Sequence, residues 1–445
     1  MTQAPAAPRS ALRRHDREIV ALAVPAFGAL VAEPLFVMAD SAIVGHLGTA
    51  QLAGLGVASA LLMTAVGVFV FLAYATTAAV ARRVGAGDLR AAIRQGMDGI
   101  WLALLIGATV IAITMPTAPA LVELFGASET AAPYAVTYLR ISALGIPAML
   151  VVLAATGVLR GLQNTKTPLY VAAAGFVANA ALNVGLVYGA GLGIAGSAWG
   201  TVIAQFGMAA SYLYVVVRGA RKHGASLRPD LGGIRACAQA GAPLLVRTLS
   251  LRAILLISTA VAAGLGDADM AAHQIIVSLW NLLAFALDAI AIAGQAIIGR
   301  YLGAEDAEGA RDACRRMVQW GIAVGIVLGL LVVLTRPLFL PLFTSDSVVQ
   351  NIALPALLVV AIAQPVSGIV FVLDGVLMGA GDGPYLAGAM VLTLAVFAPV
   401  ALLVPVLGGG LTALWLAMTF MMTMRLLTLW LRSRSGRWIV TGATR

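Results

Sequence analysis

Two acidic residues, Glu33 and Asp40, lie seven positions apart inside the otherwise apolar stretch at 25–48. In a helix this spacing is about two turns, so both side chains share one face. An ionised Asp near the centre of a bilayer costs roughly 2.5–3.5 kcal/mol, and a helix that keeps one usually turns it toward a cavity or another helix. The stretch therefore predicts a functional acid within a membrane.

Asp40 is the stronger candidate of the two. Burial disfavours the charged form of a carboxyl group, so a buried Asp40 could bind and release a proton at physiological pH. The alternative is a structural, hydrogen-bonded acid that holds its helix in place. Glu33 could instead lie near a water-filled mouth.

Three polar residues could support Asp40. Asn179 and Asn183 lie four positions apart and share one face of a helix, and Thr201 follows in the next apolar segment. These side chains could hydrogen-bond a buried Asp40 and change partners with its charge. The alternative is simple contact between helices, worth about 0.6 kcal/mol for each such bond.

The second half of the chain carries further polar residues in apolar surroundings. Asp374 lies in FVLDGVLMGAGDG, and Asp288 shares a helix face with Gln295, seven positions later. We expect these three to line a substrate path, with packing or gating as the alternative. His46 and His273 lie near predicted helix ends, where we expect exposed interfacial side chains.

These residues must be positioned by membrane-spanning helices. The chain has 445 residues, 61% of them hydrophobic and 11% charged, whereas a typical soluble domain is about 25% charged. Long apolar runs, of roughly 20 residues or more, predict spanning helices. We expect twelve, at 19–45, 52–80, 97–115, 133–158, 168–188, 193–218, 240–263, 271–298, 316–340, 349–378, 385–404 and 409–430.

Basic residues gather in alternate breaks between the predicted helices. These are the N-terminus and the segments Arg82–Arg94, Arg160–Lys166, Arg218–Arg235, Arg300–Arg316 and Arg425–Arg445. This positive-inside pattern predicts two cytoplasmic termini, and we expect a bacterial inner (plasma) membrane. The net charge of +9 therefore reports topology and does not imply a nucleic-acid partner.

An internal repeat divides the chain. One constant shift along the sequence places Pro25 on Pro243, Asp88 on Asp306 and Pro147 on Pro365. The sequence thus predicts an all-α polytopic membrane protein with two six-helix lobes, related by a pseudo-two-fold axis along the membrane normal. We expect one lobe at 1–218, a basic linker at 219–239 and a second lobe at 240–445.

Motifs of soluble catalysis are missing from the sequence. There is no GxxxxGK[ST] loop, no HExxH and no cluster of His and Cys, and Cys237 and Cys314 stand alone. We therefore expect no enzyme activity, no cofactor and no metal site, and any transport would not be driven by ATP hydrolysis on this chain.

Several long motifs resemble one family. EPLFVMADSAIVGHLGTAQLAGLG, ARRVGAGD and MAAHQIIVSLWNLLAFALDAIAIAGQAIIGRYLGAED are similar to segments of the multidrug and toxic compound extrusion (MATE) family, in its DinF-like branch. The resemblance implies two lobes around a central cavity, alternating access, and export of cationic, amphipathic compounds in exchange for H⁺ or Na⁺. Separately from this resemblance, we expect a monomer in contact with membrane lipid.

By position, the resemblance assigns roles to particular residues. It implies that Asp40 is the coupling acid, that Pro25 bends its helix and that Asp374 is an acid of the second lobe. The supporting polar residues would be Tyr138, Asn179, Asn183 and Thr201. Several family members carry Asp where this chain has Asn183. This chain therefore keeps one acid among neutral amides, and such a site suits a proton better than Na⁺.

The expected function is therefore proton-coupled efflux of organic cations. A Na⁺-coupled antiporter remains open. A flippase for lipids or lipid-linked precursors is another alternative, which would need a basic central cavity for phosphate groups. Only Arg140 and Arg252 are candidates for basic residues deep in the membrane.

Overall fold

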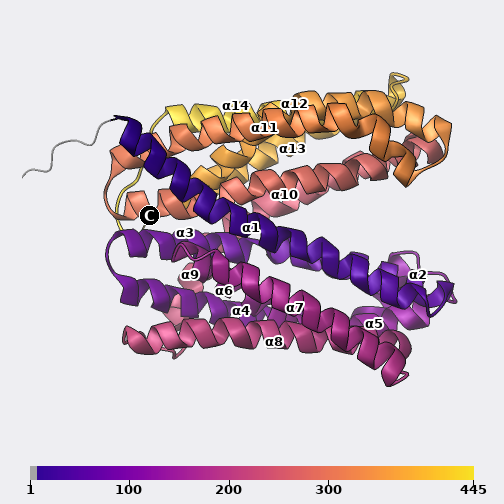
Figure 1. Ribbon diagram of the computed structural model, residues 1–445, viewed down its shortest axis with the longest axis horizontal. Coiled ribbons are helices and arrows are strands. Elements are labelled where there is room, and N and C mark those ends of the chain that lie inside the picture. Colours follow the sequence, from indigo (N-terminus) through magenta and orange to yellow (C-terminus); the bar gives the residue numbers. More distant parts are fainter. Residues whose placement is uncertain (1–7, 445) are drawn as a thin grey trace, which may run out of the picture. The chain divides into compact units, whose positions relative to one another are not determined.

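The computed structural model describes residues 8–444, and of these it leaves the side chains of residues 8–14 and of Glu33 undescribed. The described part is almost entirely helical (Figure 1). The helices of the first half are α1 (Pro8–Gly45), α2 (Thr49–Phe69), α3 (Phe71–Gly85), α4 (Leu89–Leu124), α5 (Ala132–Ala143), α6 (Ile146–Gly161), α7 (Lys166–Val184), the π-helix η1 (Gly185–Gly189) and α8 (Gly193–Lys222). The second half holds α9 (Leu231–Leu265), α10 (Asp267–Gly303), α11 (Ala307–Phe343), α12 (Ser347–Gly379), α13 (Gly383–Val406) and α14 (Leu411–Arg434).

The number of membrane spans agrees with the prediction of twelve. Within residues 8–444, eleven helical stretches are long and apolar enough to cross a membrane. α2 and α3 together form one of them, at Thr49–Gly85. The pair α5 and α6 is bent by 50° and supplies the twelfth span if it is counted as one.

The break between α5 and α6 has a local cause. Gly145 lies in the break and Pro147 stands in the first turn of α6. The repeat places Pro147 on Pro365, which lies inside the continuous helix α12. In the same register, Gly145 corresponds to Ala363 of α12. Glycine is a poorer helix former than alanine, which favours a break in the first half and a continuous helix in the second.

The repeat is also visible in helix caps. Asp88 accepts a hydrogen bond from the backbone N–H of Ala91 at 2.8 Å and begins α4. Asp306, its counterpart, accepts one from the N–H of Gly309 at 2.7 Å and begins α11. Such capping satisfies backbone donors that have no partner within the helix.

The helices form two compact units. Residues 28–241 make up one unit, and residues 8–27 together with 242–444 make up the other. In the first, α6 packs against α3, α4 and α8. In the second, α12 packs against α10, α11 and α14 (Figure 1) and is the most buried helix. The boundaries between the units fall within α1 and within α9, so each of these two long helices contributes residues to both units.

The predicted basic linker is mostly helical. α8 extends to Lys222 and α9 begins at Leu231, which leaves 223–230 as the connection. This connection packs on the start of α4, where the indole N–H of Trp101 donates to the carbonyl of Leu227 at 3.0 Å. Arg94 forms an ion pair with Asp230 at 3.1 Å.

Candidate functional site

Asp40 lies in the last turns of α1 and is 8% exposed. Three donors from three other helices face its carboxylate. The amide nitrogen of Asn183 on α7 donates to Oδ1, and the hydroxyl of Thr201 on α8 donates to Oδ2 at 3.3 Å. The hydroxyl of Tyr138 on α5 lies 3.5 Å from the same Oδ2. The structure thus gathers side chains that are far apart in the sequence around one acid.

Asn179 forms a second layer behind these donors. Its amide nitrogen donates to the Thr201 hydroxyl at 3.0 Å, and its carbonyl oxygen lies 3.5 Å from the amide nitrogen of Asn183. Both asparagines are fully buried. Their four-residue spacing on α7 turns both toward α1 and α8, as the sequence predicts.

A glycine allows this close approach of α7 and α8. A Cβ atom at Gly200 would meet the backbone nitrogen of Asn183 at 3.1 Å and would overlap its side-chain oxygen. Any larger residue there would displace the amide that faces Asp40. Beyond Asn183 the chain continues into the π-helix η1, and π-helical turns occur often at functional sites.

Tyr188 in η1 secures the end of α1. Its hydroxyl donates to the backbone carbonyl of Ile43 at 2.5 Å. Carbonyls in the last turn of a helix have no partner within it, so this bond caps the segment that carries Asp40. Tyr188 was not predicted from the sequence, because a bond to a backbone carbonyl leaves no pattern in the residues.

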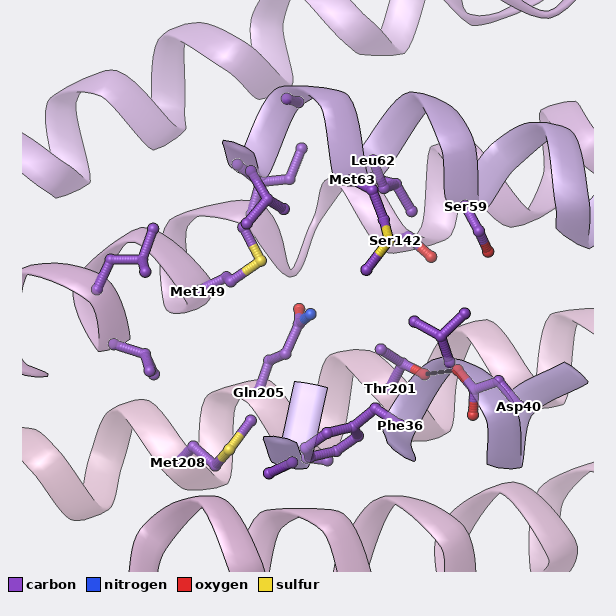
Figure 2. Close-up of a pocket in the computed structure, with 18 of the residues that line it drawn as sticks. Phe36, Asp40, Ser59, Leu62, Met63, Ser142, Met149, Thr201, Gln205 and Met208 are labelled. Carbon is purple, nitrogen blue, oxygen red and sulfur yellow. Dashed lines mark hydrogen bonds between the residues drawn. The ribbon is translucent and has the colours of Figure 1, made fainter. Parts of the chain in front are cut away.

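Asp40 borders a cavity of about 260 Å³ within the unit of residues 28–241 (Figure 2). Most of its wall is apolar, with Phe36, Met63, Met149 and Met208 around it. Gln205 reaches into the cavity from α8. Its side-chain oxygen lies in the space that a Cβ atom of residue 145 would occupy, so this position requires Gly145. Thr201, Gln205 and Met208 follow helical spacing on α8, so this shared face could have been predicted from the sequence.

Asp40 is the one charged residue among the described side chains that line this cavity. None of the ion pairs found among the described side chains includes it. Its negative charge is therefore balanced by neutral hydrogen-bond donors alone. Such a carboxylate can accept a proton or attract a bound cation.

Two other residues of α1 were predicted to take part. Pro25 is half-buried and lies inside α1, which runs as one helix from Pro8 to Gly45. Glu33 lies on the same helix, but its side chain belongs to the part of the chain that is left undescribed.

Asp374 on α12 has a different environment from Asp40. It forms ion pairs with Arg247 on α9 and with Arg425 on α14, the latter at 3.3 Å. All three side chains are buried. The expectation that Arg140 and Arg252 are the only deep basic candidates is therefore wrong. Arg425 is also not simply a residue of the basic C-terminal stretch, because α14 turns it inward toward Asp374.

Asp288 and Gln295 both lie on α10, in the other unit from the Asp40 cavity. Asp288 is half-buried. Gln295 is fully buried, and its amide nitrogen lies 3.9 Å from the sulfur of Met378.

The two histidines differ from each other. His46 is exposed, as expected, and its Nδ1 lies 2.7 Å from the carbonyl of Ala42. His273 is 0% exposed, so the prediction of a wet interfacial side chain is wrong. It faces inward from α10 and its ring lies 5.6 Å from that of Trp415.

Comparisons with known proteins agree on one family. The family model described as MatE matches residues 25–184 and again residues 243–403. The two matches begin at Pro25 and Pro243, which are the two prolines that the internal repeat superimposes. "Protein DETOXIFICATION 44, chloroplastic" of Arabidopsis thaliana is 33% identical over 438 residues, covering 95% of this chain and 83% of that protein.

Two further matches cover nearly the whole chain. "DNA damage-inducible protein F" of Escherichia coli (strain K12) is 29% identical over 437 residues, which is 96% of this chain and 95% of that protein. The crystal structure of the Vibrio cholerae MATE transporter VcmN in its bent form has a TM-score of 0.87 at 22% identity. It covers 96% of this chain and 98% of that one, and it shows the same fold.

Proposed function

Because the chain belongs to the MatE family of membrane transporters, as its resemblance to the DinF-like branch predicted, we propose that it exports organic cations in exchange for protons. The observation that carries the proposal is the position of Asp40. A single buried carboxylate, without a cationic partner among the described side chains, borders an apolar cavity of about 260 Å³.

The wall of the cavity suits amphipathic compounds. Met63, Met149 and Met208 are flexible, polarizable side chains that adapt to ligands of different shape. Phe36 offers an aromatic face, which attracts a cation or stacks on a ring. One negative charge in such surroundings favours a ligand with one positive charge and a large apolar body.

A proton and an organic cation exchange because the single carboxylate of Asp40 can balance only one positive charge at a time. When Asp40 is ionised, an organic cation in the cavity compensates its charge. When Asp40 takes a proton, the cavity loses that attraction and the cation is released. Since the donors of Asn183, Thr201 and Tyr138 bind the ionised form, protonation also weakens the hold of α5, α7 and α8 on α1.

The same geometry favours H⁺ over Na⁺. A sodium ion is held by several oxygen ligands, as other hard cations are. Asn183 presents its amide nitrogen to Asp40, and the hydroxyls of Thr201 and Tyr138 donate to the carboxylate. These groups occupy the lone pairs of Asp40 as donors, which suits a carboxylate that alternates with its protonated form.

The driving force is sufficient without ATP. Because exchange of one proton for one monovalent cation moves no net charge, the pH gradient drives it, and each pH unit is worth about 1.4 kcal/mol, which supports a roughly tenfold gradient of the cation. The positive-inside pattern supports cytoplasmic termini, and the membrane that we propose is a bacterial inner membrane.

A flippase for lipid-linked precursors has less support. No Lys or Arg is among the described residues that line the cavity. The buried bases Arg247 and Arg425 face Asp374 instead. The described lining therefore offers no cationic group to balance the charge of a pyrophosphate.

The test is dye efflux from proteoliposomes. The wild-type protein should move ethidium against its gradient when a pH gradient is imposed. Asp40→Asn should abolish this movement, because the amide cannot exchange a proton. Asp312→Asn, the same change at an exposed position on α11, is the matched control and should behave as the wild type.

Two outcomes would contradict the proposal. Proton-driven efflux by Asp40→Asn at the wild-type rate would remove Asp40 from the coupling. Efflux by the wild type that follows an imposed Na⁺ gradient and ignores the pH gradient would replace the proton by Na⁺.

A further inference from the structure

The two parts of α1 belong to different units. Residues 8–27 belong to the unit of the second half, and residues 28–45 belong to the unit that contains Asp40 and its cavity. Asp40 follows Glu18 by 22 positions, which is about 33 Å along a helix. The contacts that hold the first part of α1 are therefore separate from those that hold Asp40.

An apolar stripe packs the first part of α1 into its unit. Ile19, Leu22 and Ala26 recur at helical spacing, and each is at most 5% exposed. Five of the residues at 15–27 are buried, against three of the described side chains at 28–45, and Asp40 is one of those three. The first part of α1 is thus the more firmly packed of the two.

Ionic contacts hold the same part of α1 beside this stripe. The carboxylate of Asp16 accepts two bonds from the guanidinium of Arg316 on α11, at 2.6 Å and 2.8 Å, and one from the indole N–H of Trp320 at 2.7 Å. Glu18 forms an ion pair with Arg300 of α10 at 2.5 Å. Isolated surface ion pairs contribute little, but bidentate pairs within a network fix geometry. We call these five residues the α1 anchor.

The internal repeat shows that this anchor is a feature of α1 and not of its counterpart α9. The repeat places Asp16 on Ile234 of α9, and it places Arg316 on Asp98 of α4. An acid and a base face each other in one half, whereas an aliphatic side chain and an acid stand at the matching positions of the other. The bidentate pair therefore has no equivalent at the start of α9.

The start of α9 is held by weaker bonds. The amide of Gln95 donates to the sulfur of Cys237 at 3.1 Å. The nearby pair of Arg94 and Asp230 is largely exposed to solvent. The stronger attachment thus belongs to the helix that carries Asp40.

The two attachments of α1 respond differently to the charge of Asp40. The donors of Asn183, Thr201 and Tyr138 bind the ionised carboxylate more strongly than the protonated one. The acids of the anchor are paired with their own arginines, about 33 Å away along the helix. Protonation of Asp40 therefore loosens residues 28–45 and leaves the anchor in place.

We propose that the α1 anchor is the fixed base of transport, in which Asp16 and Glu18 are positioning residues. They hold the first part of α1 on its unit while the part that carries Asp40 moves. Without this base, a change of charge at Asp40 would shift the whole helix and would not be converted into a directed movement. The anchor itself binds neither proton nor substrate. This inference rests on the proposed function, because it assigns the anchor a role in proton-driven export.

Transport and binding should separate when the anchor is removed. Asp16→Asn combined with Glu18→Gln removes both ionic contacts at nearly constant volume. Proton-driven ethidium efflux should become at least about tenfold slower. Binding of tetraphenylphosphonium should keep its affinity within about twofold and should still release protons, because the site of Asp40 is untouched. A merely structural role would lower the number of binding sites together with the efflux.

Matched variants make the test specific. Asp16→Glu keeps the charge, so its efflux should stay within about threefold of the wild type. Arg17→Gln changes an exposed charge between the two acids, and Asp230→Asn breaks the ion pair at the start of α9; both should behave as the wild type. Asp16→Arg and Arg316→Asp should each slow efflux, and the two together should restore most of it.

Amide hydrogen exchange reads the anchor without transport. In Asp40→Asn, the amides of residues 28–45 should exchange faster than in the wild type, and those of residues 15–27 should be unchanged. In the double variant of Asp16 and Glu18, residues 15–27 should exchange faster. If the wild type fails to export ethidium but shows this exchange pattern, the proposed function fails and the anchor stands.

Three results would overturn the inference. They are wild-type efflux by the double variant, parallel loss of its binding and efflux, and faster exchange along the whole of α1 in Asp40→Asn. Arg316→Lys keeps the charge but loses the bidentate contact, and it serves where the double variant does not fold. It should slow efflux about threefold with unchanged binding, and wild-type efflux by this variant would likewise overturn the inference.

Discussion

Thr201 donates a hydrogen bond of 3.3 Å to Asp40, and its own hydroxyl oxygen accepts a bond of 3.0 Å from Asn179. The Thr201 hydroxyl therefore forms a relay of two hydrogen bonds that links the amide of Asn179 to the carboxylate of Asp40. Because the same oxygen donates on one side and accepts on the other, its orientation depends on the charge of Asp40. This relay connects α8 and α7 to the acid on α1.

Loss of the relay should slow transport. Thr201→Val keeps the shape of the side chain but removes the hydroxyl, and a hydrogen bond to a charged group is worth about 1.5–3 kcal/mol. We expect proton-driven ethidium efflux at least tenfold slower than in the wild type. Thr201→Ser keeps the hydroxyl and should stay within about twofold of the wild type. Equal rates for the valine and serine variants would show that the hydroxyl has no role.

Gln205 should influence which compounds bind in the Asp40 cavity. Its amide reaches into a cavity whose wall is mostly apolar (Figure 2). Gln205→Met nearly conserves the volume and removes the hydrogen-bonding group. We expect affinity to fall about threefold to tenfold for ethidium, which has amino groups, because one neutral hydrogen bond is worth about 0.5–1.5 kcal/mol.

The matched ligand for this test is tetraphenylphosphonium, a cation without hydrogen-bonding groups. Its affinity should stay the same or rise in Gln205→Met. Parallel losses for both compounds, measured by fluorescence and competition binding, would mean that the substitution disturbs the cavity as a whole.

Asp374 should matter for stability. Its carboxylate lies between the buried guanidinium groups of Arg247 and Arg425. Removal of one partner from a buried ion pair costs about 3–5 kcal/mol, because charge is left buried and unpaired. Asp374→Asn should therefore lower the thermal unfolding temperature of the detergent-solubilised protein clearly, and Asp312→Asn should not.

A triple variant separates stability from function at this position. Asp374→Leu combined with Arg247→Met and Arg425→Met removes all three charges together. Replacement of a buried ionic cluster by apolar residues is often neutral or stabilising. We expect the unfolding temperature to recover. A triple variant that is stable but inactive would show that the cluster takes part in transport, whereas a triple variant as unstable as Asp374→Asn would contradict the electrostatic explanation.

Much of the fold follows from the sequence because membrane helices leave strong local signals. The twelve spans come from apolar length, and the repeat comes from prolines and glycines at fixed spacing. The four-residue spacing of Asn179 and Asn183 places both on one helix face, whereas Tyr138 was assigned only by the resemblance to the family. The bend between α5 and α6 was missed, because a glycine and a proline do not by themselves tell a broken helix from a continuous one.

Other features depend on tertiary packing. Arg425 follows the last apolar run and resembles the basic residues that mark the cytoplasmic side. Only the packing of α14 on α12 turns it toward Asp374. His273 likewise lies near a helix end in the sequence, but α10 buries it against Trp415. Helical periodicity gives the face of a residue, and it does not give what that face contacts.

The central claim is that one carboxylate, Asp40, binds either a proton or an organic cation. The most direct test is proton release on binding, measured with a pH indicator in a lightly buffered solution of the purified protein. Tetraphenylphosphonium suits the measurement because it has no ionisable proton, so any proton released comes from the protein. Near neutral pH, its binding to the wild type should release protons in step with occupancy, and its binding to Asp40→Asn should release none. Saturable binding to the wild type without any release between pH 5 and pH 8, or undiminished release by Asp40→Asn, would contradict the claim.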